Sequence, residues 1–503
     1  MTRHDHATVV ERGINEILQA QGAAAAGQQL PRSRTTSTRS VTQLFPISVS
    51  TILKSAALQG EDRITARISH CERGGATATH AAIWLYRATT SEPSFMSAPS
   101  RRDGERGMRH STERILSTHG GSLPRPDDFD EMIAAKAPVS DLQKRLPSAV
   151  QEVVDEQISS GLDVINDGEF VKAASGSYAA YILDRVTGWG PDPDPDRAPK
   201  RAGTAERDHR VFPGVYESGL WLSGSGPLPR PGFFKPGPPR TGVRRVCDGP
   251  VQYVGQDAIK ADTDALAEAL EGKDDVEGFI AALGPLSLGA GSTNLYYPSE
   301  EEYMMAVAEV VHEEYKAITD AGYIVQIDEP EFATTWSFYP DWSVEDLRKY
   351  LSFAVEVINH ALEGLPEDQV RFHVCWGSGH RPHTTDIPLE AFADLMLKIN
   401  AQAYSVEASN VRHAHEYRVW EKVKLPDGKI LVPGVISHAT DLVEHPELVA
   451  ERLINFANIV GKENLQASTD CGIGYRVGHA EIVWAKLRSM SEGCRIASEK
   501  LFS

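Results

Sequence analysis

The pattern of hydrophobic and polar positions changes near residue 108. Residues 1–107 show little sustained periodicity and contain polar stretches such as RSRTTSTRS and SAPSRRDGERG. From Met108 onward, apolar runs of strand length alternate with helical patterns. We therefore predict that residues 1–107 form a mostly disordered N-terminal extension and that residues 108–503 form the functional domain. A regulatory or targeting role for the extension is the alternative.

Eight strand-like runs follow Met108. They are residues 115–121, 162–169, 279–288, 323–330, 371–377, 403–408, 430–437 and 465–470. Helical patterns separate most of them, and strands that alternate with helices are typical of an α/β fold. Eight such units predict a (β/α)8 TIM barrel. A doubly wound sheet competes with this prediction, but no glycine-rich nucleotide loop follows an early strand.

Three helices have recognisable start signals. Ser299 with Glu302, and Ser343 with Asp346, have the spacing of a capping box, in which two orphan backbone N–H groups are satisfied. Pro446 is placed like the first residue of a helix, where the missing N–H costs nothing. The segments after these residues are therefore predicted to be helical.

Residues 188–245 interrupt the alternation because they are rich in proline and glycine. Such a composition does not sustain a regular helix or strand. We predict a long inserted loop over one face of the barrel, with a disordered tip at 195–212. The following run, 244–255, is predicted to be an extra strand outside the eight.

Composition and charge narrow the classes of function. The formal net charge of −19 disfavours binding to nucleic acid or to an anionic membrane surface. No apolar run approaches the roughly 20 residues that cross a bilayer, and we expect no leader peptide, because no charged-then-apolar segment with a cleavage site opens the chain. The 5 cysteines are scattered and odd in number, so a disulfide framework is not expected. We expect a cytoplasmic protein whose partners are small molecules.

Polar residues, with two glycines, gather where the predicted strands end, which is where barrel enzymes carry their chemistry. These residues are His119, Gly120, Gly121, Ser122, Asp167, Glu169, Asp328, Glu329, His373, Cys375, Glu407, Ser437, His438, Asp470 and Cys471. Each alone is compatible with a helix cap or a solvated turn. Their coincidence at most of the strand ends predicts a site there.

Four of these residues form a set of metal ligands. His373, Cys375, Glu407 and Cys471 offer one imidazole, two thiolates and one carboxylate, and this softness favours Zn²⁺ over Mg²⁺ or Ca²⁺. His373 and Cys375 share one face of a strand, because side chains alternate with period two. The competing interpretation is that the cysteines are small buried apolar residues and that Glu407 faces water.

The strings THGGSLPRP, INDGEF, VQIDEPEF, HVCW, SVEAS, VPGVIS and STDCG together resemble the catalytic C-terminal barrel of the cobalamin-independent methionine synthase family. The resemblance covers most of residues 113–503. It implies the barrel of the methionine synthase and uroporphyrinogen decarboxylase superfamily. It also implies transfer of a methyl group from 5-methyltetrahydrofolate to the zinc-bound thiolate of homocysteine.

The resemblance assigns roles to individual positions. It makes the four residues above the zinc ligands. Gly121 and Ser122 match the family's GS pair, which holds the amino-acid substrate, while Glu169 and Asp328 match carboxylates that face the substrate ammonium. This chain reads D-G-E at Glu169 where the family reads H-G-E.

The proton donor is the least defined role. The leaving amine of the methyl donor needs protonation, and the family offers a histidine after its G-V string. His438 lies one residue away from that place and is the catalytic candidate. His445 is a second candidate, with the alternative that it only begins a helix.

The resemblance leaves three alternatives open. Full-length family members have two barrels and this chain has one, so part of the folate surface is expected to be absent. A related thiol alkyltransferase, such as an epoxyalkane–coenzyme M transferase or a corrinoid-dependent enzyme, is one alternative. A non-catalytic barrel with a structural zinc is another, and a decarboxylase on a cyclic substrate is the third.

Overall fold

The computed structural model describes residues 107–170, 172, 181–194, 196–203, 206–217, 245–377, 382–474 and 476–503. The predicted extension at 1–107 lies almost entirely outside these residues, so its disorder stays a prediction. Among the described helices, none is long and apolar enough to cross a bilayer.

Eight parallel strands form the central sheet. They are β1 (Leu116–Ser117), β2 (Val164–Ile165), β5 (Glu277–Leu283), β7 (Ile324–Asp328), β8 (Val370–Val374), β9 (Ala403–Val406), β10 (Ile430–Ile436) and β11 (Gln466–Thr469). Their order is β1-β11-β10-β9-β8-β7-β5-β2. The N–H of Asp163, next to β2, donates to the carbonyl of Ser117 in β1 at 3.0 Å and so brings the two ends together. Every strand overlaps one of the eight predicted runs, and the (β/α)8 barrel is confirmed.

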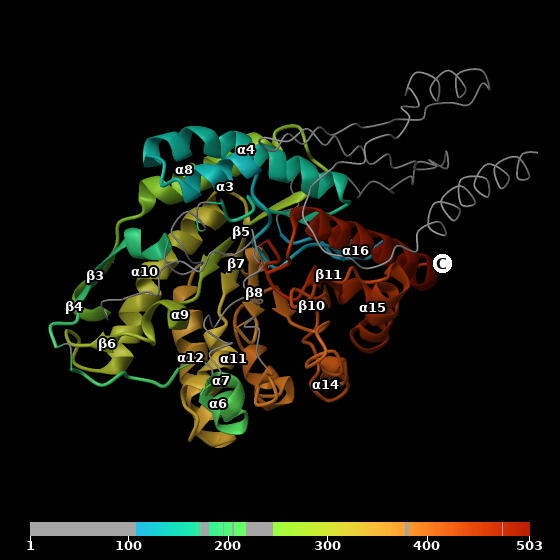
Figure 1. Cartoon of the computed structure of the whole chain (residues 1–503). Helices are drawn as coiled ribbons and strands as arrows, with labels where there is room; N and C mark the ends of the chain where they lie inside the picture. Colours follow the sequence, from blue (N-terminus) through green and yellow to red (C-terminus); the bar gives the residue numbers. More distant parts are fainter. Residues whose placement is uncertain are drawn as a thin grey trace, which may run out of the picture. The chain divides into compact units, whose positions relative to one another are not determined.

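Helices follow the strands and cover the outside of the sheet (Figure 1). The longer ones are α3 (Asp127–Ala134), α4 (Val139–Ser159), α8 (Gln256–Leu270), α10 (Glu300–Asp320), α12 (Val344–Ala361), α15 (Pro446–Val460) and α16 (Ala480–Leu501). Shorter α-helices are α9 (Pro285–Gly289), α11 (Glu331–Phe338), α13 (Ala393–Met396) and α14 (Val419–Lys422). Single 3₁₀ turns are η1 (Tyr181–Asp184), η2 (Glu367–Gln369), η3 (Leu389–Ala391), η4 (Glu416–Arg418) and η5 (Lys462–Asn464).

The start signals act as the sequence predicts. The Ser299 hydroxyl accepts the N–H of Glu302 at the start of α10, and Ser343 with Asp346 forms a complete capping box at the start of α12. Pro446 is the first residue of α15. These local bonds fix where the helices begin, while the apolar faces of the helices bury against the strands.

The inserted region contains more regular structure than its composition predicts. β3 (Val186–Pro191) pairs antiparallel with β4 (Arg245–Tyr253), and β6 (Thr293–Asn294) joins them in a three-stranded sheet. The extra strand is therefore confirmed. The disordered tip at 195–212 is wrong in part, because α6 (Glu206–Val211) and α7 (Pro213–Glu217) lie in or beside it.

One contact explains why α6 is ordered. The Arg207 guanidinium carbon lies 3.3 Å from the centre of the Trp336 ring on α11, and its Nε donates to the Trp336 carbonyl at 2.6 Å. The Thr385 hydroxyl also donates to Asp208 at 2.8 Å. Since α11 follows β7, this part of the insert lies over the end of the barrel at which the strands finish.

A buried ionic network connects the inserted sheet to the barrel helices. Arg185 donates to Asp262 of α8 at 2.6 Å and to Glu314 of α10 at 3.3 Å. The hydroxyls of Tyr181 and Tyr253 each donate to Glu314 at 2.8 Å. All five side chains are buried, so each charge depends on its partners for the hydration that it has lost.

Replacing Arg185 by Met is expected to lower the free energy of unfolding by about 3–5 kcal/mol, because two buried carboxylates lose their counter-charge. Urea denaturation followed by circular dichroism measures this. Arg495 pairs with two glutamates on the exposed side of α16, and the matched Arg495→Met control should change stability by less than about 1 kcal/mol. Equal effects of the two substitutions would contradict the assignment.

Candidate metal centre and substrate pocket

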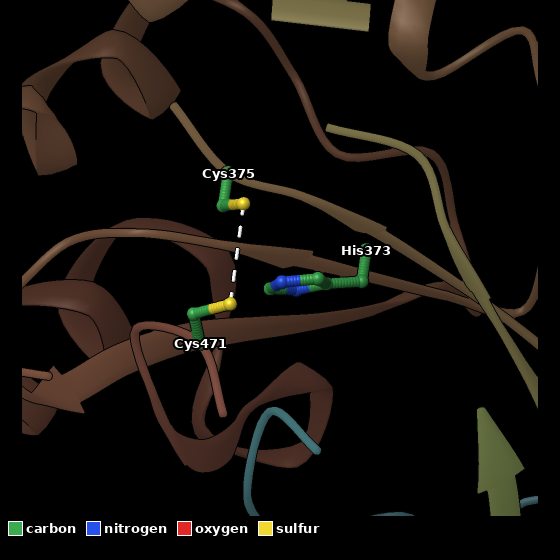
Figure 2. Close-up of side chains that lie close together, drawn as sticks. All are labelled: His373, Cys375 and Cys471. Atoms are coloured by element: carbon green, nitrogen blue, oxygen red, sulfur yellow. Dashed lines mark hydrogen bonds between the residues drawn. The ribbon is translucent and has the colours of Figure 1, made fainter. Parts of the chain in front are cut away.

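Three of the four predicted metal ligands come together at one end of the barrel. His373 lies on β8, Cys375 follows it by two residues, and Cys471 follows β11. Their ligand atoms all lie within 4.8 Å of one another. Figure 2 shows the imidazole of His373 reaching toward the two sulfur atoms, which are 4.0 Å apart.

These side chains fit a metal ion. The His373 Nε2 atom is buried and makes no hydrogen bond of normal geometry in the described part of the chain. Its Nδ1 atom lies 3.0 Å from the Ser405 hydroxyl, which orients the ring and leaves Nε2 for a metal. Two thiolates on a tetrahedral ion with bonds of about 2.3 Å lie about 3.8 Å apart, close to the separation of the two sulfurs.

The two cysteines have opposite acidities. The hydrogen bond between the two thiols holds the pKa of Cys471 well below its usual range, and the neighbouring Arg476 and His373 lower this pKa further. The same hydrogen bond, together with burial, raises the pKa of Cys375 well above its usual range. One thiolate is therefore ready for a cation, and cation binding releases the proton of the other thiol.

Glu407 lies beside this group and not within it. Its carboxylate accepts the backbone N–H of Trp376 at 2.9 Å and the side-chain amide of Asn410 at 2.8 Å. It groups instead with His438 and Asp470, with ligand atoms within 4.8 Å. Burial, with the nearby Asp470, raises the pKa of Glu407 to about 7. Its role as fourth ligand stays a prediction.

Asp470 connects the strand that carries Glu407 to the strand that carries Cys471. Its carboxylate accepts three successive backbone N–H groups, those of residues 408–410, at 2.8, 2.8 and 3.0 Å. The carboxylate is fully buried. The sequence marks Asp470 as a polar strand end but gives it no role, because these partners lie about 60 residues away.

A buried histidine lies behind Glu407. His413 stacks on Trp376 with ring centres 4.0 Å apart. Its two ring nitrogens lie 2.8 Å from Glu416 and 3.3 Å from Asp386. Although burial opposes it, hydrogen bonding to these two carboxylates raises the pKa of His413 to about 10. A cation thus lies under the indole next to the site.

The predicted substrate residues lie near the metal group, at the ends of neighbouring strands. Gly121 has φ 140°, and a Cβ there would collide with the Glu169 carboxylate, so glycine is needed at this position. Glu169 itself has φ 59°, and its N–H donates to the Asp167 side chain at 3.0 Å. Ser122 packs against Gly472, the residue after Cys471. Glu169 is thus held in a strained backbone conformation that is typical of functional positions.

A lysine that the sequence does not single out lies near the two predicted carboxylates. Burial raises the pKa of Glu169 to about 8, an increase that the charge of Lys172 opposes and that of Asp328 adds to. Burial also raises the pKa of Asp328, again opposed by Lys172. Lys172 donates to the carbonyl of Ala281, and Gln326 donates to Asp328 at 2.8 Å. The positive charge of Lys172 therefore offsets part of the negative charge of Glu169 and Asp328.

The two histidine candidates for proton transfer differ in position. His438 is buried beside Glu407, and burial followed by the charge of Arg476 lowers its pKa to about 4. It is therefore neutral at neutral pH. His445 is exposed and caps α15, where its ring accepts the N–H of Glu447 at 3.2 Å. The alternative that His445 begins a helix is confirmed.

Asp470→Asn is expected to lower the affinity for Zn²⁺ by about 10–100-fold, because the loop after β9 loses a charged acceptor and Glu407 loses its alignment. Titration against a coloured chelator measures this. Asp264, which is exposed on α8 and pairs only with Lys260 among the described residues, gives the matched control Asp264→Asn. An unchanged zinc affinity in Asp470→Asn would refute the positioning role.

Comparison with known proteins adds the family context. Residues 252–495 match the model described as "Cobalamin-independent synthase, Catalytic domain". The methionine synthase of Sulfurisphaera tokodaii is 25% identical over 386 residues, which cover 76% of this chain and 92% of that protein. The 2-hydroxypropyl-CoM lyase of Xanthobacter autotrophicus is 26% identical over 245 residues, which cover 43% of this chain and 61% of that protein.

A solved structure has the same fold. The B12-independent methionine synthase from Shewanella sp. W3-18-1, in complex with selenomethionine, superposes with a TM-score of 0.53 at 19% identity. The match covers 77% of this chain and 99% of that one. At this level of identity the likeness shows the barrel fold.

Proposed function

We propose that this chain, which belongs to the cobalamin-independent synthase family and is a methyltransferase enzyme, transfers a methyl group to the thiolate of homocysteine at a zinc centre, forming methionine. The observation that carries the proposal is the convergence of His373, Cys375 and Cys471 at the end of the barrel, next to Glu169 and Asp328. The proposed methyl source is 5-methyltetrahydrofolate.

The donor set favours Zn²⁺ as the metal. Two thiols and an imidazole are softer than the oxygen ligands that Mg²⁺ and Ca²⁺ prefer. With Glu407 as the fourth ligand, the set is that predicted from the sequence. A free thiol has a pKa near 8.5 and is mostly protonated at neutral pH. A bound zinc ion would keep the substrate thiol ionised.

The protein residues position the amino-acid part of the substrate. Glu169 and Asp328 receive the ammonium group, and Gly121 with Ser122 forms the surface against which the substrate lies. Because both carboxylates are buried, a substrate ammonium replaces lost hydration and holds them in the ionised form. The substrate sulfur is then directed toward the metal ligands.

The reaction is a displacement at the methyl carbon. The electron pair of the thiolate forms the new sulfur–carbon bond, the carbon–nitrogen bond of the donor breaks, and its electron pair stays on the nitrogen, which takes up a proton. His438 is the candidate for proton delivery. Because its pKa is about 4 it is neutral at rest, so it is suited to pass a proton from solvent to the leaving nitrogen and not to store one.

A second candidate function is alkyl transfer to a different thiol. The similarity to 2-hydroxypropyl-CoM lyase favours it, since the substrate in that relative's name is a conjugate of coenzyme M, which is not an amino acid. Glu169 and Asp328 favour homocysteine, because two carboxylates in the pocket suit an ammonium that coenzyme M lacks.

Zinc-loaded protein is expected to form methionine from homocysteine and 5-methyltetrahydrofolate, with methylcobalamin tested separately as donor. Removal of the metal with a chelator should abolish the product, and added Zn²⁺ should restore it. Mass spectrometry with a labelled methyl group measures the transfer. If zinc is bound and neither donor gives methionine, homocysteine methylation is wrong and the second candidate is favoured.

Glu169→Gln and Asp328→Asn are each expected to raise the KM for homocysteine by about 10–100-fold, because a charge-assisted hydrogen bond to the ammonium is lost. Steady-state kinetics measures this. The KM for 4-mercaptobutyrate, which has no ammonium, should hardly change in either variant. Glu345→Gln, on the exposed start of α12, is the control. A similar rise for both thiols would contradict the ammonium assignment.

A further inference from the structure

An arginine that the sequence analysis did not single out lies at the metal end of the barrel. Arg476 follows Cys471 by five residues, in the loop between β11 and α16. Its side chain is half-buried, and its Nη1 atom donates to the carbonyl of Gly472 at 2.9 Å. This bond holds one edge of the guanidinium.

Within the described residues, no carboxylate lies within ion-pair distance of Arg476, whereas Arg185 and Arg201 have carboxylate partners. Cys471, Cys375, Glu407 and Glu169 are near enough that their charges act on its pKa. An arginine offers five N–H donors, and among the described residues one hydrogen bond from Arg476 is present, to the carbonyl of Gly472.

Ser122 is held against the loop that carries Arg476. The N–H groups of Ile473 and Gly474 donate to the Ser122 carbonyl at 3.0 and 2.8 Å. A Cβ on Gly472 would lie 2.5 Å from the Ser122 hydroxyl, and the carbonyl of this same glycine accepts from Arg476. The hydroxyl of Ser122 and the guanidinium of Arg476 therefore both lie beside Gly472, and each of them can donate hydrogen bonds.

We propose that Arg476 binds the α-carboxylate of the amino-acid thiol, together with Ser122, opposite the two carboxylates that receive its ammonium. A Cβ on Gly121 would collide with the Glu169 carboxylate, and Ser122 is the next residue in the chain, so the groups proposed for the ammonium and for the carboxylate are neighbours, as the adjacent charges of an α-amino acid require. The inference rests on the proposed function and deepens it, because Arg476 would select a zwitterionic thiol over a neutral one.

The carboxylate that Arg476 binds could belong to the amino-acid thiol or to the methyl donor, and an experiment has to distinguish the two. The glutamate tail of a folate donor also carries carboxylates, and an arginine near the mouth of the site would attract them. The adjacency to Ser122 favours the amino-acid substrate. Binding of the thiol without any methyl donor therefore distinguishes the two sources.

The test uses the full chain loaded with Co²⁺, whose absorption reports entry of a thiol into the metal shell. Homocysteine is compared with 3-aminopropane-1-thiol, which lacks only the carboxylate. In Arg476→Met the Kd for homocysteine is expected to rise by about 10–100-fold while the Kd for the aminothiol stays within about twofold. Arg476→Lys, which keeps the charge but loses the planar fork, should fall between.

Arg418 is exposed on η4 and gives the matched control Arg418→Met, which should leave both Kd values unchanged. An equal loss for both thiols would show that Arg476 only supports the fold or the metal, and no loss for either would show that it is not used; each overturns the proposal. A raised KM for the folate donor with unchanged thiol binding would assign Arg476 to the donor and also overturns it. If the wild-type protein binds cobalt but admits neither thiol, the proposed function itself fails.

Discussion

The carboxylate of Asp470 is the interaction on which the candidate site depends most. It accepts hydrogen bonds from three backbone N–H groups after the end of β9. It also lies next to Cys471 at the end of β11, although β10 separates these two strands. A Cβ on Gly434 of β10 would collide with Asp470, so the intervening strand leaves room for it. The ends of three strands are thus held together by one buried charge, and the ligands that they carry keep their spacing.

The site concentrates ionisable groups in a place where water is scarce. Burial opposes the charged forms of Glu169, Glu407 and His438, so the pKa values of the two carboxyl groups rise and that of His438 falls. The opposite acidities of the two cysteines follow from the same shortage of solvent, because a buried pair shares a proton and does not lose both. Such a pocket favours the binding of cations, and both a metal ion and a substrate ammonium can supply the positive charge.

Much of the fold could be predicted from the sequence because its signals are local. Apolar runs bounded by turns place all eight strands, and the hydroxyl caps place the starts of α10 and α12. His373 and Cys375 could be paired because strand periodicity is also local. The roles of Asp470, Lys172 and Arg476 could not be predicted, since each depends on residues that only the closed barrel brings near. The order in α6 was missed for the same reason, as a distant tryptophan stabilises it.

The stacking of His413 on Trp376 has an optical consequence. A protonated imidazole in contact with an indole is an efficient quencher of tryptophan fluorescence, and this imidazole stays protonated well above neutral pH. The backbone of the same tryptophan donates to Glu407. Movement of Glu407 toward a bound cation therefore also displaces Trp376, whose indole is quenched. Trp376 is therefore a built-in emission probe of the centre, and it reports on the site without a label.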